Sequence, residues 1–341
     1  MVYEMRRIGL CRIAIAVVAL ALVVSPLSAA VIYVKGNAAG TNAGTSWTNA
    51  YVLLQSALDA AVSGDEIWVA AGTYKPTSDY GLVASGTLVQ DRLKHFRLKN
   101  GVAIYGGFAG TESKRSRRDV QANVTTLSGN IGAAGDAGDN CYHVFHHPNG
   151  LGLDVTAVLD GFTVTAGNAN GTLTVYYVRG GGMLNDHSSP TIANCTFSGN
   201  SASNSGGGME NFSSSPTIMN CAFSDNSASY YGGGMENVSG SPTITGCTFT
   251  GNSAADYGGG MKNYEASPTM TDCVFRQLSR RLRRRDGKLF FARDAHELHV
   301  QRQLGGLWRR DMQQCIIPNA HELRVQRQLD GLLRRRDVQQ L

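Results

Sequence analysis

The chain has 341 residues, and its 31 Lys and Arg residues outnumber its 26 Asp and Glu residues, which gives a formal net charge of +5. The excess comes from residues 276–341, which hold 16 basic and 7 acidic residues and leave 15 against 19 in residues 1–275. Residues 1–275 are therefore mildly acidic, so the net charge does not indicate a nucleic-acid or anionic-membrane partner for that part of the chain.

The N-terminus has the pattern of an exported bacterial protein. Arg6, Arg7 and Arg12 precede an apolar run over residues 13–24, and small residues follow at 28–30. This order is typical of a cleaved secretory signal peptide. The run is shorter than the roughly 20 residues that a transmembrane helix needs. We therefore predict a signal peptide over residues 1–30, cleaved after Ala30.

Residues 31–179 are predicted to form irregular coils, less regular versions of the repeats that follow. Short apolar runs bounded by turn residues predict strands around residues 31–34, 66–70, 96–98, 102–105, 126–127, 142–145 and 157–159. One helix is predicted over residues 50–62, with Leu54, Ala57 and Leu58 on one face and Gly64 as a C-cap. Because a bare first coil would invite other chains to pair with it, we expect this helix to cap the N-terminal end.

Residues 180–275 contain four copies of a 26-residue repeat. Gly-Gly-Gly-Met recurs at 180, 206, 232 and 258, and each copy continues with Ser-Pro-Thr and then Cys-x-Phe. A period of 20 to 50 residues marks a solenoid. Helical repeats are excluded because no segment keeps apolar residues at helical spacing, whereas the short runs between turn residues indicate strands. The sequence thus predicts an all-β fold, a parallel β-helix solenoid with 26-residue coils.

Equivalent residues of successive coils are expected to stack in columns about 4.8 Å apart. Three columns are expected to point inward: Ile192, Ile218, Ile244 and Met270; Cys195, Cys221, Cys247 and Cys273; Phe197, Phe223, Phe249 and Phe275. Strict alternation would put Ile192 and Cys195 on opposite faces, so the chain must bend at Asn194 and at its equivalents Asn220, Gly246 and Asp272. The thiols are interpreted as small buried hydrophobes, with disulfides between adjacent coils as the alternative.

Two further columns consist of asparagine. They are Asn200, Asn226 and Asn252 at a second corner, and Asn185, Asn211, Asn237 and Asn263. Side-chain amides in such stacks can hydrogen-bond along the axis. We interpret both columns as structural rather than as ligand contacts.

Carboxylates are the first candidates for catalysis. Glu210 and Glu236 should stack one coil apart, between Leu184 and Lys262, at a distance that would suit a pair of catalytic carboxyl groups. Because they replace other residues at one repeat position, we expect them to lie on the solvent-exposed surface instead. Asp154 and Asp160 belong to a single coil, and Asp160 is expected to be structural.

Histidine and basic clusters are the other candidates. His143, His146 and His147 could hold a metal ion if they converged, but His146-His147-Pro148 is typical of a loop and lacks a carboxylate partner. The basic cluster at residues 114–118 is expected to be a solvated loop. We therefore assign no catalytic, cofactor-binding or metal-binding residue and no cofactor.

Residues 276–341 keep a spacing of about 26 residues between recurring motifs, although the Gly, Ser and Asn of the repeats are replaced by Arg, Gln and Leu. Arg-Asp recurs at 285, 310 and 336, and Ala-His-Glu-Leu at 295 and 320. If Asn-Cys-Thr-Phe-Ser-Gly-Asn is read one base early, one choice of codons gives Leu-His-Val-Gln-Arg-Gln-Leu, which stands at 298–304. We therefore interpret residues 276–341 as a frameshifted tail that packs poorly and leaves the last coil uncovered. A basic nucleic-acid-binding tail and an amphipathic interaction helix are the alternatives.

Several motifs resemble a known group of bacterial proteins. The segments Ser46–Tyr51, Gly72–Pro76, Tyr105–Phe108 and Leu159–Thr163 resemble right-handed parallel β-helix proteins of the pectin-lyase-like fold. The Phe-x-x-Asn element at Phe197–Asn200, Phe223–Asn226 and Phe249–Asn252 is similar to the repeats of polymorphic outer membrane proteins, although the glycine element of this chain contains Gly and Met instead of Gly-Gly-Ala and an aliphatic residue. The resemblance covers residues 31–275 and implies a secreted or surface-exposed protein, often carried by a separate outer-membrane barrel or anchor.

We therefore expect an exported protein of the cell outer membrane or the extracellular space. Its function is predicted to be non-catalytic, as an adhesion, structural or passenger module that binds extended glycans or cell-surface proteins. The alternative is a carbohydrate-active lyase or hydrolase, or a carbohydrate-binding β-helix. No nucleic-acid partner is expected, a membrane would be reached only through an anchor or barrel, and uncovered strand edges could associate with one another.

Overall fold

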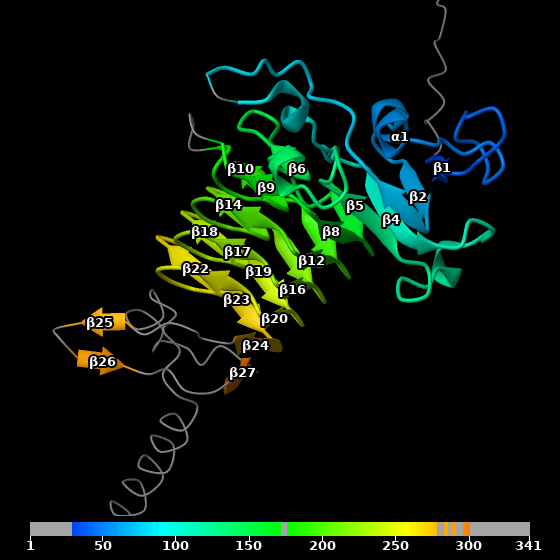
Figure 1. Cartoon of the computed structure of the whole chain (residues 1–341). Coiled ribbons are helices and arrows are strands. Elements are labelled where there is room, and N and C mark those ends of the chain that lie inside the picture. The colour runs from blue at the N-terminus through cyan, green and yellow to red at the C-terminus, as the bar shows by residue number, and fades with distance from the viewer. Residues whose placement is uncertain are drawn as a thin grey trace, which may run out of the picture.

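A computed structural model of the chain describes residues 29–86, 88–171 and 176–277, together with short strands at 283–285, 288–290 and 296–300. The strands form a stack of parallel coils that runs from β1 at one end to β24 at the other (Figure 1). The predicted signal peptide lies outside the described residues except for Ala29 and Ala30, and so does most of the predicted tail. Within the described residues, no helix is both long and apolar enough to cross a bilayer.

Sheet A runs the full length of the stack and is entirely parallel. Its strands, in spatial order, are β1 (Val31–Val34), β2 (Glu66–Ala70), β4 (Ala103–Phe108), β7 (Val158–Asp160), β11 (Thr191–Ala193), β15 (Thr217–Met219), β19 (Thr243–Thr245) and β23 (Thr269–Thr271).

Sheet B lies beyond the first corner of each coil. Its strands are β3 (Gly72–Tyr74), β5 (Thr125–Ser128), β8 (Thr163–Thr165), β12 (Thr196–Ser198), β16 (Ala222–Ser224), β20 (Thr248–Thr250), β24 (Cys273–Gln277) and β27 (His296–Val300). Pairing is parallel up to β24, which β27 joins in the antiparallel sense. The expectation of an uncovered last coil is therefore wrong for β24.

Two shorter parallel sheets complete the coils. Sheet C contains β6 (Phe145–His147), β10 (Met183–Asp186), β14 (Met209–Phe212), β18 (Met235–Val238) and β22 (Met261–Tyr264). Sheet D contains β9 (Asn168–Ala169), β13 (Ser201–Ala202), β17 (Ser227–Ala228) and β21 (Ser253–Ala254). A separate antiparallel pair is formed by β25 (Arg283–Arg285) and β26 (Lys288–Phe290).

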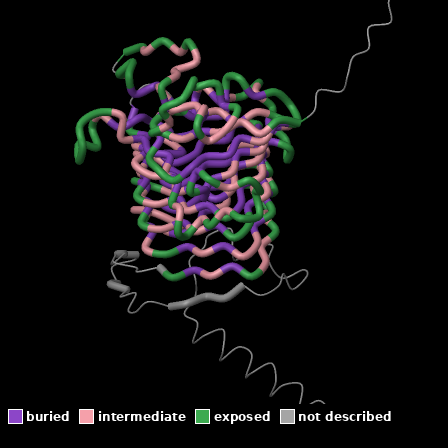
Figure 2. The backbone as a smooth tube through the Cα atoms, turned by 90° about the vertical axis from the view of Figure 1, so that its right-hand side faces the viewer, coloured by how far each residue is buried: buried purple, intermediate pink, exposed green. Residues whose placement is uncertain are grey.

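The predicted inward columns form the core. The Ile, Cys and Phe columns belong to one buried cluster, and Figure 2 shows buried residues running through the middle of the stack. The Phe rings stack nearly parallel, with centroids 4.5 to 5.0 Å apart. A fourth column that the sequence did not reveal joins them, made of Met183, Met209, Met235 and Met261.

The predicted bend between sheets A and B is confirmed. Asn194, Asn220 and Asp272 have φ of 50° to 53°, and Gly246 has φ of 64°. This left-handed conformation turns one residue out of the strand, so Ile192 and Cys195 can both face inward. Asn, Asp and Gly tolerate it better than other residues do, which explains the composition of this column.

The predicted helix is confirmed but shorter than expected. Helix α1 (Leu54–Ala60) buries Leu54, Ala57 and Leu58 and contacts β1 and β2 at the N-terminal end of the stack. It begins late because Tyr51 still pairs with Val34 in extended conformation. It ends at Ala60, with Ala61 rather than the expected Gly64 as its C-cap. Three short 3₁₀ helices lie in the irregular coils, at Gln90–Leu93, Arg115–Arg117 and Ala137–Asp139.

Candidate functional site

The carboxylate pair lies on the outer side of sheet C. Met and Asn side chains alternate with it and face inward, so Leu184, Glu210, Glu236 and Lys262 form one outward column in register. The predicted stacking of the two glutamates is therefore confirmed, and so is the order of the column.

The expectation that these glutamates are solvent-exposed is wrong. Glu210 is 0% and Glu236 4% exposed, because the chain before each Gly-Gly-Gly-Met crosses the outer side of sheet C. Arg179, Ser205, Tyr231 and Tyr257 form a row of parallel bridges in this covering segment. Ser205 Oγ donates a hydrogen bond to Glu210 Oε2 at 2.8 Å.

Gly206 allows the covering segment to pass close to Glu210. Gly206 has φ of 63°, and a Cβ at this position would lie 2.6 Å from the carbonyl oxygen of Met209 and 2.8 Å from Glu210 Oε2. Only a residue without a side chain can turn the backbone back so close to the glutamate. Gly180, Gly232 and Gly258 have the same left-handed conformation in their coils.

A basic side chain lies near each of the two glutamates. Arg179 Nη1 lies 3.8 Å from Glu210 Oε1, and Lys262 Nζ lies 3.9 Å from Glu236 Oε1. Burial, together with the neighbouring charge of Glu236, raises the pKa of Glu210 well above its usual value, although Arg179 and Ser205 oppose the shift. Two buried carboxyl groups in contact favour holding one proton between them.

A cavity of about 50 Å³ lies beside Glu210. Its lining residues are Tyr176, Arg179, Leu184, Asp186, Glu210 and Phe212. Glu210 Oε1 and Arg179 Nε are buried without a hydrogen-bond partner. A cavity of this size holds a few water molecules, which would satisfy both groups. It does not hold a sugar ring between the two glutamates, as glycoside hydrolysis requires.

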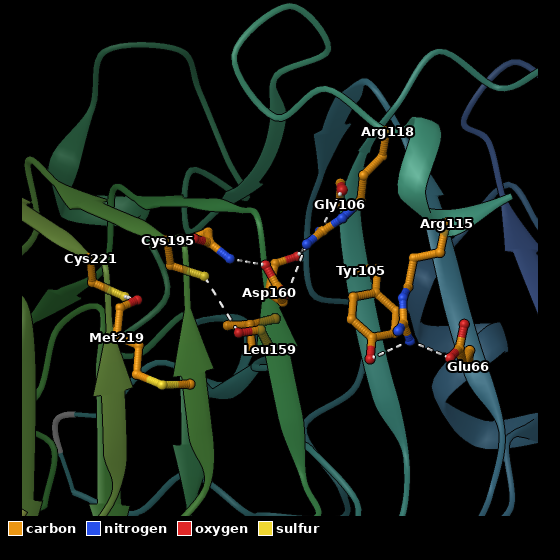
Figure 3. Close-up of polar contacts among 11 residues, drawn as sticks. Glu66, Tyr105, Gly106, Arg115, Arg118, Leu159, Asp160, Cys195, Met219 and Cys221 are labelled. Carbon is orange, nitrogen blue, oxygen red and sulfur yellow. Dashed lines mark hydrogen bonds and ion pairs between the residues drawn. The ribbon is translucent and has the colours of Figure 1, made fainter. Parts of the chain in front are cut away.

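The basic cluster is only partly the solvated loop that was expected. Lys114 and Arg117 are exposed, but Arg118 Nη2 pairs with Asp160 Oδ2 at 2.8 Å, with both side chains 15% exposed. Arg115 Nη1 donates to Tyr105 Oη at 2.9 Å and also to Glu66 (Figure 3). The 3₁₀ turn at Arg115–Arg117 therefore fastens the loop onto the outer side of β2, β4 and β7.

Asp154 and Asp160 have separate structural partners. Asp160 Oδ1 accepts a hydrogen bond from Asn194 Nδ2 at 2.8 Å, so the residue links the Arg118 loop to the first regular corner. Asp154 is exposed and accepts hydrogen bonds from both the backbone and the hydroxyl of Thr156, which lower its pKa.

The histidines come together, but as part of the core. His146 and His147 lie in strand β6 rather than in the expected loop, because Phe145–His147 pairs with β10. His146 lies between His143 and His95, with ring centroids 5.0 and 5.1 Å away. Mainly through burial, the pKa falls to about 3 for His95, to about 4 for His143 and His147, and well below its usual value for His146.

These neutral histidines do not form a metal site. Among the described residues, no three His, Cys, Asp or Glu side chains are placed to hold an ion. His147 instead begins the asparagine ladder: its Nδ1 donates to Asn185 Oδ1 at 2.7 Å, while Leu98 N donates to its Nε2. Imidazole supplies a donor on one side and an acceptor on the other, as each amide of the ladder does.

The thiol groups of the cysteine column are buried and form hydrogen bonds with backbone carbonyl groups. Each Sγ contacts the carbonyl oxygen of a residue in the preceding coil: Cys195 with Leu159, Cys221 with Ile192, Cys247 with Ile218 and Cys273 with Ile244. The five cysteines that the structure describes are all free and buried. Their interpretation as small buried side chains is confirmed.

Comparisons with known proteins concern the fold. A family model described as a right handed beta helix region matches residues 120–281. One solved structure, a rhamnogalacturonan lyase, is 12% identical, with a TM-score of 0.33 over 73% of this chain and 66% of the lyase, just under two thirds of its length. No curated protein matches the chain. Together with the parallel sheets, the family match identifies the fold as an all-β, right-handed parallel β-helix.

Proposed function

We propose that this chain is an exported, non-catalytic β-helix that acts as a binding or adhesion module outside the cell. The observation that carries the proposal is the burial of Glu210 and Glu236. A glycoside hydrolase needs two carboxyl groups that flank the scissile bond of a bound sugar. This pair lies under its own backbone, between Arg179 and Lys262, where it contributes to the fold.

The candidate residues of the irregular coils support the same conclusion. Asp160 forms an ion pair with Arg118 and a hydrogen bond with Asn194. His147 forms hydrogen bonds with Leu98 and Asn185. A group that is fully engaged within the protein is poorly placed to take a proton from a substrate. The outer surfaces of the stacked sheets remain, and they suit an extended partner.

A polysaccharide lyase or hydrolase is the second candidate. It is favoured by one observation, the cavity beside Glu210 with the unpartnered Glu210 Oε1 and Arg179 Nε. Such a site would need the covering segment at Ser205 to open before a sugar could enter.

Incubating the purified full chain with polygalacturonate, alginate and neutral glucans tests these alternatives. We expect no new reducing ends and no unsaturated products. Product release that Glu210→Gln abolishes, and that the exposed control Glu265→Gln preserves, would establish the enzyme and overturn our proposal.

Export is tested separately. When the full chain is produced in a Gram-negative bacterium, we expect it outside the cytoplasm, with an N-terminus at Val31 by mass spectrometry. Retention of the unprocessed chain in the cytoplasm would contradict export.

A further inference from the structure

The outer side of sheet B carries a regular array of hydroxyl groups. In strands β8, β12, β16 and β20 the central residue points into the core, and the residues on either side of it point outward. The outward residues form two columns in register, namely Thr163, Thr196, Ala222 and Thr248, and Thr165, Ser198, Ser224 and Thr250. We call these eight residues the hydroxyl face; seven of them are Ser or Thr.

The hydroxyl face is held flat and in register by the core beneath it. Phe197, Phe223 and Phe249 alternate with its side chains and stack with centroids 5.0 and 4.9 Å apart and planes within 6°. Neighbouring strands repeat at about 4.8 Å, and alternate residues along a strand at about 6.6 Å. The hydroxyl groups therefore form a two-dimensional lattice over four coils.

These hydroxyl groups are available to a partner. Seven of the eight residues are partly exposed and Thr250 is exposed. Within the described part of the chain, no hydrogen bond joins any of the seven hydroxyl groups to another protein group. A hydroxyl group donates one hydrogen bond and accepts two, so the face offers donors and acceptors at regular intervals.

None of the eight residues of the hydroxyl face is ionisable, and Arg276 continues its second column in the next coil, beside Thr250. On the outer side of sheet A, the irregular coils carry Glu66 and Asp160, crossed by Arg115 and Arg118 (Figure 3). Sheet C has the column that contains Glu210 and Lys262. Along the four coils of the hydroxyl face an anionic ligand would lose hydration and would meet a cation only at Arg276, so most of the face suits a neutral partner.

We propose that the hydroxyl face binds an uncharged, extended polysaccharide, an inference that rests on the binding-module function proposed above. The sugar hydroxyls along such a polymer both donate and accept, as those of Thr and Ser do. The methyl groups of threonine can contact the C–H surface of the sugar rings. The face lacks the Trp, Tyr and Arg side chains that anchor protein interfaces. Each contact is weak, but many successive contacts on one chain add to the retention.

Adsorption of the purified full chain to microcrystalline cellulose tests the inference. We expect binding to cellulose that exceeds binding to polygalacturonate. Thr248→Lys places a charge in the middle of the face and should lower affinity for cellulose about tenfold. The matched control is Thr243→Lys, five positions earlier in the same coil but on the outer side of sheet A, and should change affinity less than about twofold.

A more conservative variant tests the same hydroxyl group with less risk of disturbing the fold. Thr248→Val keeps the side-chain shape and removes one hydroxyl group, and should weaken binding by about threefold with an unchanged circular dichroism spectrum. Failure of the unsubstituted chain to bind cellulose, or equal losses in the Thr248→Lys and Thr243→Lys variants, would overturn the assignment of the hydroxyl face. Neither result would affect the non-catalytic function, which only product release overturns.

Discussion

Glu210 shows how completely a residue's surroundings can change its chemistry. Its side chain begins on the outer side of a sheet, where a glutamate is normally hydrated. The turn at Gly206 and the hydroxyl of Ser205 enclose it, and Glu236 lies directly alongside in the next coil. The result is a buried carboxyl group for which the protonated form is favoured.

The contribution of Glu210 to the stability of the protein should therefore decrease as pH rises, whereas the buried histidines, whose pKa values are lowered, contribute the opposite trend below about pH 6.5. The pKa of Glu210 is higher in the folded than in the unfolded chain, so folding retains a proton that unfolding releases. This contribution is fully present below the ordinary carboxyl pKa and is lost as pH rises through the raised folded value, with a slope of at most about 1.4 kcal/mol per pH unit. Urea unfolding across a pH series measures it.

The Glu210→Gln variant should lose this slope because its side chain stays neutral. Glu265→Gln, at an exposed position, should keep the slope of the unsubstituted chain. Parallel profiles for the Glu210→Gln variant and the unsubstituted chain would show that Glu210 does not hold the proton.

For a single residue such as Glu210, the sequence predicts which residues stack beside it but not whether its side chain is buried. The 26-residue period places Glu210 beside Glu236, as the structure confirms. The cover comes from residues that precede the glycine run, and their path over sheet C depends on the left-handed turn at Gly206. His146 and His147 escaped recognition as strand residues for a similar reason, since their partners in β10 lie almost 40 positions later.

Among the elements, the ladder that runs from His147 to Asn263 connects five coils. Each amide Nδ2 donates to the Oδ1 of the next asparagine at 2.8 Å, from Asn185 through Asn211 and Asn237 to Asn263. A second ladder at Asn200, Asn226 and Asn252 has the same direction. Buried amides in such an arrangement are satisfied only while every member is present.

Replacing one member of the ladder should therefore be costly. Asn211→Ala leaves Asn185 Nδ2 and Asn237 Oδ1 buried without partners, and should lower the free energy of unfolding by about 1–3 kcal/mol for each unsatisfied group. The control is Asn204→Ala, seven positions earlier in the chain, because among the described residues the Asn204 side chain makes no hydrogen bond that could be lost. Denaturant titration of both variants measures the difference, and equal losses would contradict a structural role for the ladder.

Sheets and corners were largely predictable because they recur. The Ile, Cys and Phe columns and the bend at Asn194 followed from one period and strict alternation along a strand. The methionine column did not, because the flanking glycines conceal its alternation. Helix α1 was expected from Leu54, Ala57 and Leu58, but its start depends on the pairing of Tyr51 with Val34, which lie in the irregular coils, where no repeat predicts the pairing.

The whole molecule is a one-dimensional stack in which each coil contacts mainly its neighbours. Stability in such a stack grows with each added coil and is weakest at an uncovered end. In the described chain, β21, β22 and β23 are the last strands of their sheets, while β24 is followed by the antiparallel β27. The change of direction coincides with the change of composition after Phe275.

We propose that residues 276–341 are further coils translated in the wrong reading frame. Sequencing the gene tests this directly. Codons after Phe275, shifted by one base, should restore Ser-Gly-Asn and Gly-Gly-Gly-Met at the spacing of the earlier repeats. A frame-restored chain should unfold at a higher temperature than the present one, because added coils would cover β21, β22 and β23. Codons that restore neither motif would contradict the proposal.

The identical pairing of successive coils also bears on how this protein changes over time. Phe197 pairs with Phe223 as Phe223 pairs with Phe249, so removing the middle coil would join two strands that already fit. Recombination between repeats can therefore shorten or lengthen the gene by whole coils without disturbing the core. Insertions of another length within a strand would displace every column beyond them. Related lineages should then differ in coil number, in steps of 26 residues, more readily than in the residues inside a coil.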